Sequence, residues 1–326
     1  MTAEAAGEPP APLTARDVCV IVPCLDEAPA IPGVVRDLMR VLPGARVVVV
    51  DNGSTDGTAA AARAAGAEVI VEPRRGKARA MLTAFARVDA DVVIMIDGDG
   101  SYPAEGAALL LARHRERRCD MLTGVRVSVD PRSAFRPMHQ AGTRAFELAL
   151  DQVFGFRSRD LFSGLRLFSA PFYQSVPVLS RGFELELELT IQAIDKGFHV
   201  EEMEVPFTVR AEGTASKLRS IHDGLRILSF LVLLFRDYRP MRFFGAIGLA
   251  FAAAGLAAGI LPVTEFIRSG TVGRFPLAFL AASLEVIAIL TMQVGVIIEG
   301  TLRYAREGFQ VRVRQLSIAR ELRRGP

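Results

Sequence analysis

Two long apolar stretches near the end of the chain constrain its architecture more than any other feature. Residues 243–264 are 22 residues without a charged side chain, and residues 276–298 are 23 residues with only one, Glu285. Each is long enough to cross the hydrocarbon core of a bilayer as a helix, which takes roughly 20 residues. We therefore predict a transmembrane hairpin. A lipid-facing carboxylate would be costly, so Glu285 is expected to face the other helix or a neighbouring subunit.

The composition agrees with membrane attachment and argues against several classes of protein. Hydrophobic residues make up 50% of the chain, and its mean hydropathy is +0.29, which excludes a disordered protein. Lys and Arg number 39 against 36 Asp and Glu, so the net charge is only +3. That balance is too even for a protein that binds nucleic acid by neutralising many phosphates. The three cysteines show no zinc-binding spacing and suit a reducing compartment.

Arginines on either side of the apolar stretches predict the orientation of the hairpin. Arg236, Arg239 and Arg242 precede the first stretch, and residues 299–326 contain seven arginines. By the positive-inside rule, both ends of the hairpin face the cytoplasm and the linker 265–275 faces outward. The sequence therefore predicts a multi-pass protein of the inner (cytoplasmic) membrane with a cytoplasmic globular domain.

The rest of the chain divides into four parts. Residues 1–16 lack the basic and apolar regions of a signal peptide and are expected to form a disordered lead. Residues 17–218 carry the patterns of a globular domain. Residues 219–242 are expected to form an amphipathic helix beside the membrane, although a core helix of the same domain would explain the pattern equally well. Residues 299–326 are expected to form a basic cytoplasmic tail on anionic headgroups.

Short strand patterns alternate with helical patterns between Val18 and Val125. The strand patterns are VCVIVP (18–23), RVVVVD (46–51), EVIVEP (68–73) and DVVIMID (91–97). Continuous apolar strands separated by helices predict an α/β fold with a parallel sheet covered on both faces. Ligands bind at the carboxyl ends of the strands in such sheets, and Asp51 and Asp97 each end a strand. Residues 126–175 are expected to be irregular apart from one helix.

Two motifs at these strand ends carry candidate chemistry. In IDGDG (96–100), Asp97 and Asp99 offer the oxygen ligands that Mg²⁺ and Mn²⁺ prefer alongside substrate phosphates. The alternative is a turn with two solvated aspartates. In VVVVDNGSTDGT (47–58) a strand ends at Asp51 and a turn leads into a helix, which together with IDGDG indicates a nucleotide pocket. The GxGxxG and GxxxxGK[ST] motifs do not occur at the positions that a dinucleotide oxidoreductase or a P-loop ATPase would require.

Seven motifs, in this order, resemble those of the family 2 glycosyltransferases, which have the GT-A fold. They are VPCLDEAPAI, VVVVDNGSTDGT, RRGKARAM, MIDGDGSYP, LFSGLRLFS, GFELELELT and EVPFTVRAEGTASKL, within residues 18–218. The chain most resembles the branch that passes a sugar from a nucleotide to a polyprenyl phosphate, as in dolichyl-phosphate mannose synthase and bacterial polyprenyl-phosphate glucosyltransferases. The resemblance implies a Rossmann-like, mostly parallel sheet and an inverting reaction.

The resemblance also implies roles for the residues that match these motifs. The positions that surround the base, ribose and diphosphate of the donor match Pro23, Leu25, Glu27, Asp51 and Lys77. The positions near the acceptor, or closing over the metal and phosphates, match Ser163, Gly164, Arg166, Arg210, Ser216 and Lys217. The DxD pair matches Asp97 and Asp99. Asp99 is then the direct ligand of Mg²⁺ or Mn²⁺, and Asp97 lies close to the ribose or the metal.

Three positions depart from the family pattern. Asp26 stands where Asn is usual, and Asn52 stands where many members have a second Asp. Ser101 replaces the Gln that often follows the DxD pair and can help to bind the metal. The first two changes leave undecided which side chains contact the nucleotide, and the third leaves undecided which side chains bind the metal.

The run GFELELELT permits two interpretations. Its alternation of apolar and acidic residues by itself predicts a half-buried strand. The family resemblance instead implies a helix, with one of three glutamates near the sugar: Glu184, Glu186 or Glu188.

The expected reaction needs no general base. A lipid phosphate monoester is largely dianionic at neutral pH, because its second pKa is roughly 6. It would attack directly while the metal, Lys77 and Arg210 neutralise the leaving diphosphate. The side chains that could hold the acceptor phosphate are Arg126, Arg132, Arg136 and Arg166. We expect a UDP-hexose donor, with GDP-mannose next, and a homo-oligomer packed through the membrane spans.

Three other functions were weighed against this one. A processive polysaccharide synthase uses a QxxRW motif, whereas this chain contains no Trp. A transferase that acts on a glycolipid headgroup or a protein would share the same motifs, so only the acceptor separates it. A catalytically silent nucleotide-sugar-binding scaffold would have little reason to keep Asp97, Asp99, Lys77, Arg210 and Lys217 together.

Overall fold

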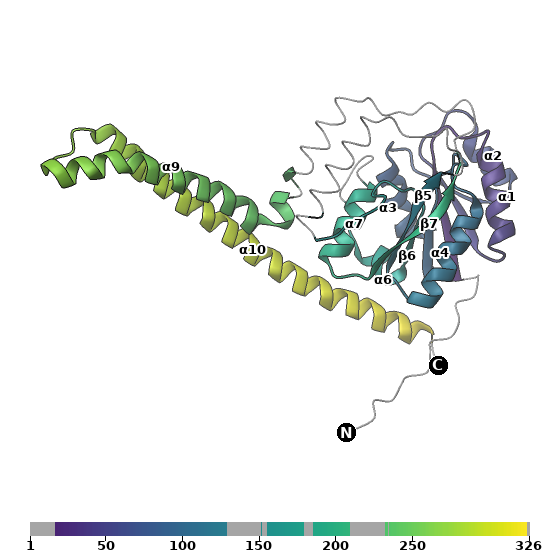
Figure 1. Ribbon diagram of the computed structural model, residues 1–326. Coiled ribbons are helices and arrows are strands. Elements are labelled where there is room, and N and C mark those ends of the chain that lie inside the picture. The colour runs from purple at the N-terminus through teal and green to yellow at the C-terminus, as the bar shows by residue number, and fades with distance from the viewer. Residues whose placement is uncertain are drawn as a thin grey trace, which may run out of the picture. The chain divides into compact units, whose positions relative to one another are not determined.

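The computed structural model describes residues 17–128, 151, 155–178, 185–208, 232–233 and 235–324 (Figure 1). The chain divides into two compact units. The first unit is Met1–Ser216 with Gln315–Pro326, and the second is Lys217–Arg314.

A seven-stranded sheet forms the core of the first unit (Figure 1). The strands are β1 Val18–Cys24, β2 Arg46–Asp51, β3 Glu68–Val71, β4 Val92–Met95, β5 Met121–Ser128, β6 Arg166–Ser169 and β7 Val200–Phe207. Their order is β3-β2-β1-β4-β6-β5-β7. Strand β6 runs antiparallel to β4 and β5, and the other pairs are parallel. The predicted mostly parallel α/β sheet is confirmed.

Helices cover both faces of this sheet. They are α1 Ile31–Val41, α2 Thr58–Ala64, α3 Lys77–Arg87, α4 Ala104–Arg117, α6 Ala170–Ser175 and α7 Leu185–Asp195. Alternate side chains of a strand point to opposite faces. Val18, Val20 and Val22 of β1 join the hydrophobic cluster that includes α1 and α4, whereas Cys19 and Ile21 are equally buried on the opposite face, where α3 packs against β1. Both faces of the sheet are therefore shielded from water, which explains why the apolar runs of the strands are uninterrupted.

The segment expected to be irregular contains regular structure in its second half. Strand β6 and helix α6 lie within residues 166–175, and β6 inserts between β4 and β5. The irregular interpretation is therefore wrong for these residues. Of the helix expected near residues 139–155, only Asp151 and Gly155 lie within the described residues.

The LELELT run forms helix α7, as the family resemblance implies, and not the strand that alternation alone predicts. Residues 185–193 are all buried, including Glu186 and Glu188. Residues two apart lie on opposite sides of a helix, so these two glutamates reach different partners. Glu188 accepts a hydrogen bond from Gln192 at 2.8 Å. A helix that is buried all round has no polar face, so its sequence lacks the amphipathic period by which a surface helix is recognised.

The second unit contains a helical hairpin made of α9 Pro240–Ser269 and most of α10 Phe275–Arg324. By length and composition, both helices are able to cross a membrane. The predicted spans lie inside them, and α10 continues as a helix through the predicted tail to Arg324. Most of the expected juxtamembrane helix, 219–242, lies outside the described residues.

Small residues let α9 and α10 pack closely within this unit. Gly248, Gly255 and Pro262, seven residues apart, are buried along α9. A Cβ on Gly255 would lie 2.7 Å from Glu285 Oε1 of α10 and 3.2 Å from the Ala281 carbonyl oxygen. Glu285 therefore faces the other helix of the hairpin, as predicted, and a glycine makes room for it.

Candidate functional site

Side-chain hydrogen bonds join the two loops that follow β1 and β2. Asp26 Oδ1 accepts a hydrogen bond from the Thr55 N–H at 2.8 Å, and the Asp26 N–H donates to Ser54 Oγ at 3.0 Å. The Glu27 N–H donates to Thr58 Oγ1 at 2.9 Å. Asp26 has a φ of 54°, a left-handed conformation that Asp and Asn tolerate better than most residues. Asp at this position therefore keeps the loop shape that Asn would adopt.

Asn52 holds the loop that precedes Lys77. Its Nδ2 donates to the carbonyl oxygens of Glu72 at 3.1 Å and Arg74 at 2.8 Å, and its Oδ1 accepts from the Gly76 N–H at 2.6 Å. A carboxylate cannot donate to two carbonyls. The Asn that departs from the family pattern therefore has a structural role, which is to place the first residue of α3, Lys77.

Lys77 joins two carboxylates from distant parts of the chain. Its Nζ lies 2.6 Å from Asp97 Oδ1 and 2.6 Å from Glu186 Oε1. Asp97 follows β4, and Glu186 lies in the first turn of α7. Burial opposes the charge on Lys77, but the two carboxylates outweigh it and raise the pKa of Lys77 above its usual value. Lys77 is therefore a fixed positive charge at the carboxyl edge of the sheet.

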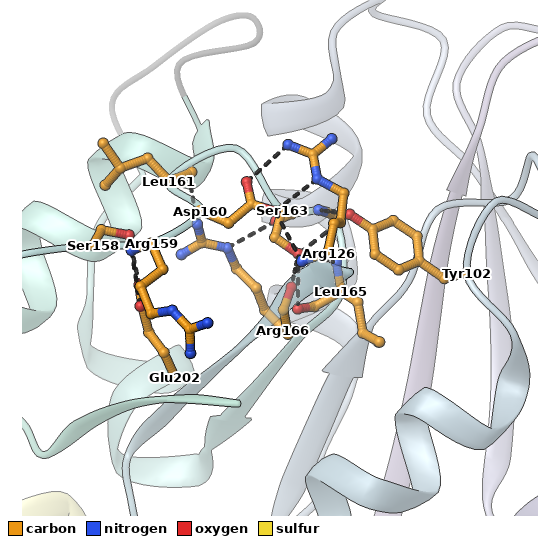
Figure 2. Close-up of polar contacts among 12 residues, drawn as sticks. Tyr102, Arg126, Ser158, Arg159, Asp160, Leu161, Ser163, Leu165, Arg166 and Glu202 are labelled. Atoms are coloured by element: carbon orange, nitrogen blue, oxygen red, sulfur yellow. Dashed lines mark hydrogen bonds and ion pairs between the residues drawn. The ribbon is translucent and has the colours of Figure 1, made fainter. Parts of the chain in front are cut away.

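The loop before β6 packs directly against Asp97. A Cβ on Gly164 would lie 2.0 Å from Asp97 Oδ2, so only glycine allows this approach. The Gly164 N–H donates to Tyr102 Oη at 2.9 Å, and Ser163 Oγ lies 3.2 Å from the same oxygen (Figure 2). Ser163 is fully buried and its hydroxyl also donates to the Gly124 carbonyl. Residues 163–166, which we call the SGLR loop, are thereby fastened beside residues 97–99, which we call the DxD turn.

Arg166 lies beneath this loop and is not at its surface. Its side chain is 0% exposed. Its Nε donates to the Ser163 carbonyl at 3.0 Å and its Nη2 to the Leu161 carbonyl at 2.6 Å (Figure 2). Its Nη1 donates to Thr190 Oγ1 of α7 at 2.7 Å. Burial lowers the pKa of Arg166. The residue ties the SGLR loop to α7, a role that its motif alone did not indicate.

Arg126 is paired with Asp160. Its Nε lies 2.7 Å from Asp160 Oδ2 and its Nη2 lies 2.8 Å from Oδ1 (Figure 2). Burial opposes the charge on Arg126, but Asp160 raises its pKa above the usual value. The guanidinium also lies over the Phe207 ring, 5.5 Å from its centroid. An acceptor phosphate would have to share Arg126 with Asp160.

Asp99 and Glu27 bring further carboxylates to the DxD turn. Asp99 Oδ1 accepts hydrogen bonds from the Ser101 N–H at 3.0 Å and the Ser101 hydroxyl at 2.5 Å. A Cβ on Gly98 would lie 2.3 Å from Glu27 Oε2, so Glu27 packs against the backbone of the turn. Burial and the negative charge of Asp99 raise the pKa of Glu27 to about 7. Within the described part of the chain, Glu27 Oε2 is buried without a hydrogen-bond partner.

These carboxylates suit a hard divalent cation that is shared with a ligand. Asp97, Asp99 and Glu27 supply the oxygen atoms that Mg²⁺ and Mn²⁺ prefer. Burial and the negative charge of Asp99 raise the pKa of Glu27, and a cation beside these carboxylates would favour its charged form. The described residues contain no group of three or more His, Cys, Asp or Glu arranged to hold a metal by themselves. A metal here would therefore take its remaining ligands from substrate phosphates and water.

The other predicted residues fall into two sets. Asp51 is buried at the end of β2, where its Oδ1 accepts from the Ser54 N–H at 3.2 Å, and Pro23 and Leu25 lie at the end of β1. Six candidates lie outside the described residues, namely Arg132, Arg136, Glu184, Arg210, Ser216 and Lys217.

Two residues of the site were not anticipated. Tyr102 holds the SGLR loop, and Asp160 pairs with Arg126. Only the position of Tyr102 directly after the DxD turn offered a signal, and nothing in the sequence pattern distinguished Asp160 from a surface carboxylate.

Comparisons with known proteins show which family of sequences this chain resembles. The family model described as Glycosyl transferase family 2 matches residues 19–176. Glycosyltransferase AglJ of Haloferax volcanii is 30% identical over 276 residues, which are 84% of this chain and 87% of AglJ. A dolichyl-phosphate hexose transferase of the same organism is 28% identical over 201 residues, covering 62% of this chain and 87% of that protein.

Solved structures share the fold. Glucosyl-3-phosphoglycerate synthase of Mycobacterium tuberculosis, in complex with Mn²⁺ and UDP-glucose, matches with a TM-score of 0.53 and 23% sequence identity. The match covers 67% of this chain and 78% of that one. At this identity the likeness establishes the fold alone.

Proposed function

Because the chain belongs to glycosyltransferase family 2, we propose that it transfers a hexose from a nucleotide diphosphate sugar to a polyprenyl phosphate at a membrane. The observation that carries the proposal is the meeting of Lys77, Asp97 and Glu186 beside Asp99 at the carboxyl edge of the sheet. We favour a UDP-sugar as the donor, with GDP-mannose next.

The leaving diphosphate is the group that this site must stabilise. Asp99, with Asp97, would hold Mg²⁺ or Mn²⁺, which supplies positive charge for the diphosphate oxygens. Lys77 adds a second charge whose position is set before the donor arrives, because Asn52 and two carboxylates hold it. Such preorganised charges stabilise the transition state without a reorganisation cost. Glu186, which shares the Lys77 ammonium, lies where a sugar hydroxyl could be bound.

The chemistry is a direct displacement. An oxygen of the lipid phosphate forms a bond to the anomeric carbon while the bond from that carbon to the diphosphate oxygen breaks. The nucleophile is already an anion, so no side chain must remove a proton. The configuration at the anomeric carbon inverts.

Among the arginines expected around the acceptor, the two described ones take different parts. Arg126 is partly accessible and lies beside the Phe207 ring, so we assign it to the acceptor phosphate in competition with Asp160. Arg166 is a positioning residue, because its guanidinium donates its hydrogen bonds to the SGLR loop and to α7. We retain Arg210, Ser216 and Lys217 as the residues that close over the phosphates.

A lipid acceptor is supported by the hairpin and by one relative. Helices α9 and α10 are able to span a membrane by length and composition, and a relative of the chain is named a dolichyl-phosphate hexose transferase. We propose that the hairpin tethers the catalytic unit to the cytoplasmic face of the membrane, where polyprenyl phosphate is within reach. We also propose that copies of the chain associate through these helices.

The test uses the purified full chain in detergent with polyprenyl phosphate, Mn²⁺ or Mg²⁺, and a panel of UDP- and GDP-sugars. Release of the nucleoside diphosphate is measured with and without the lipid. Asp99→Ala removes the proposed metal ligand, and Asp37→Ala removes an exposed carboxylate of α1 as a matched control.

We expect lipid-dependent release from one donor that is lost in EDTA and in Asp99→Ala but kept in Asp37→Ala. Release that needs a different acceptor would redirect the proposal to a glycolipid headgroup or a protein. Donor binding without release under any condition would leave a nucleotide-sugar-binding scaffold.

A further inference from the structure

Ser101 is engaged with Asp99 through two separate donors. Its N–H donates to Asp99 Oδ1 at 3.0 Å and its hydroxyl donates to the same oxygen at 2.5 Å. Both side chains are buried, with Ser101 2% exposed and Asp99 6% exposed. Two donors on one carboxylate oxygen fix the plane of the carboxylate, and therefore the direction in which its second oxygen points.

The backbone of Ser101 is anchored from the other side by the end of β7. The Ser101 carbonyl accepts a hydrogen bond from the Thr208 N–H at 2.9 Å and another from the Thr208 hydroxyl at 3.2 Å. The next residue, Tyr102, packs its ring edge-on against Phe207, with the ring centroids 5.1 Å apart. Ser101 is thus held between β7 and the DxD turn and has little freedom to turn toward a ligand.

We propose that Ser101 is a positioning residue that orients Asp99 toward the metal and is not itself a metal ligand. The proposal rests on the metal-assisted function above and refines it. A serine side chain is short, its hydroxyl proton is given to Asp99, and its surface is almost wholly covered. The metal would therefore take one more oxygen from water or from the donor phosphates than a site with a longer ligating side chain at this position.

The consequence is a metal affinity that depends on a residue the metal does not touch. Hydrogen-bond partners of metal ligands typically change metal affinity by about 10- to 100-fold when they are removed. If Ser101 only stabilised the fold, its loss would lower the stability of the first unit without changing how the folded protein binds metal.

The experiment measures Mn²⁺ binding to the full chain in detergent in the presence of UDP, using the electron paramagnetic resonance signal of free Mn²⁺. Ser101→Ala removes the hydroxyl. Ser169→Ala is the matched control, because Ser169 Oγ also donates to an aspartate, Asp120, at 2.8 Å. Ser169 pairs with Val92 at the opposite end of β4 from the DxD turn. Thermal unfolding in EDTA confirms that each variant is folded.

We expect Ser101→Ala to weaken Mn²⁺ binding by about 10- to 100-fold, with UDP binding in EDTA unchanged and Ser169→Ala equal to the unaltered chain. Ser101→Thr, which keeps the hydroxyl, should restore most of the affinity. Equal Mn²⁺ affinity in Ser101→Ala and the unaltered chain would overturn the inference.

A thiol at this position separates orientation from ligation. Cysteine is a softer ligand than serine and favours Cd²⁺ over Mn²⁺. If Ser101 orients Asp99, Ser101→Cys should bind Cd²⁺ no more tightly than Ser101→Ala does. Tight Cd²⁺ binding by the cysteine variant alone would show that position 101 is a ligand and would refute the proposal. Failure of the unaltered chain to bind Mn²⁺ with UDP would instead overturn the metal-assisted function, and this inference with it.

Discussion

Replacing Gly164 by alanine should disable the site through Asp97 without unfolding the protein. The added Cβ would lie 2.0 Å from Asp97 Oδ2 and 2.5 Å from its Cγ. Asp97 cannot easily yield, because its other oxygen is held by the Lys77 ammonium at 2.6 Å. Either the carboxylate leaves Lys77 or the SGLR loop moves away from the DxD turn.

The size of the effect follows from these distances. Real Cβ contacts are essentially never shorter than 3.0 Å, so the two groups must separate by about 1 Å. A misplacement of about 1 Å in a catalytic constellation costs on the order of 100-fold in rate, which corresponds to about 2.7 kcal/mol in the activation free energy. Overpacking of this kind also lowers the free energy of unfolding by about 1–3 kcal/mol.

The assay is kcat/KM for lipid-dependent release of the nucleoside diphosphate, with thermal unfolding measured in parallel. Gly106→Ala is the control, because its Cβ would also be tight, 2.8 Å from Leu165 Cδ2. There the contact is the end of an apolar side chain that is able to rotate, and alanine favours the helix α4. We expect near-normal activity in Gly106→Ala and a loss of about 100-fold in Gly164→Ala.

A double-mutant cycle tests whether Asp97 carries the effect. Once Asp97→Ala has removed the carboxylate, adding Gly164→Ala should cost little further activity. Two outcomes would refute the reasoning. One is full activity in Gly164→Ala. The other is an equal, additive loss with and without Asp97.

Asn52→Asp would place a carboxylate against the carbonyls of the loop 72–76. It should therefore lower the unfolding free energy by about 1–3 kcal/mol and weaken UDP binding, which calorimetry measures. Unchanged UDP binding would argue against the proposed placement of Lys77. Ionisation of Glu27, whose pKa is raised from 4.5 to about 7, should make the metal-free protein less stable as the pH rises through that interval. Thermal unfolding of Glu27→Gln in EDTA should lack this part of the pH dependence. Gly255→Val should destabilise the helical hairpin toward heating or proteolysis in detergent, whereas Gly245→Val, which has open space around it, should not; equal effects would contradict the close packing of α9 on α10.

Local patterns in the sequence determined much of the fold. The apolar runs of β1, β2 and β4 predict buried strands because a run without polar residues cannot face water on either side. Each C-terminal apolar stretch is long enough to cross a bilayer as a helix, so its length predicts a long helix. Asp97 was singled out because it ends a buried apolar strand and begins a distinctive motif, whereas Lys77 was assigned only through the family resemblance. Signals of this kind depend on neighbours in the chain, so one sequence is enough to read them.

The partners of these residues were decided only by tertiary structure. The Lys77 ammonium joins Asp97, 20 residues away, to Glu186, 109 residues away, and no local period specifies such a pair. Helix α7 lacks the amphipathic period of a surface helix because it is buried all round, and burial depends on what packs against it. The sequence around Arg166 would be the same whether its side chain faced a ligand or the protein interior.

What the sequence determined by itself is where charge, apolar length and strand ends occur along the chain. What tertiary structure decided is which of those charges meet, because electrostatic and packing energies depend on distance in space and not on separation in sequence. The short insertion of β6 between β4 and β5 illustrates the reason. Four residues that carry little strand signal bring Gly164 against Asp97, and that contact places the SGLR loop beside the DxD turn.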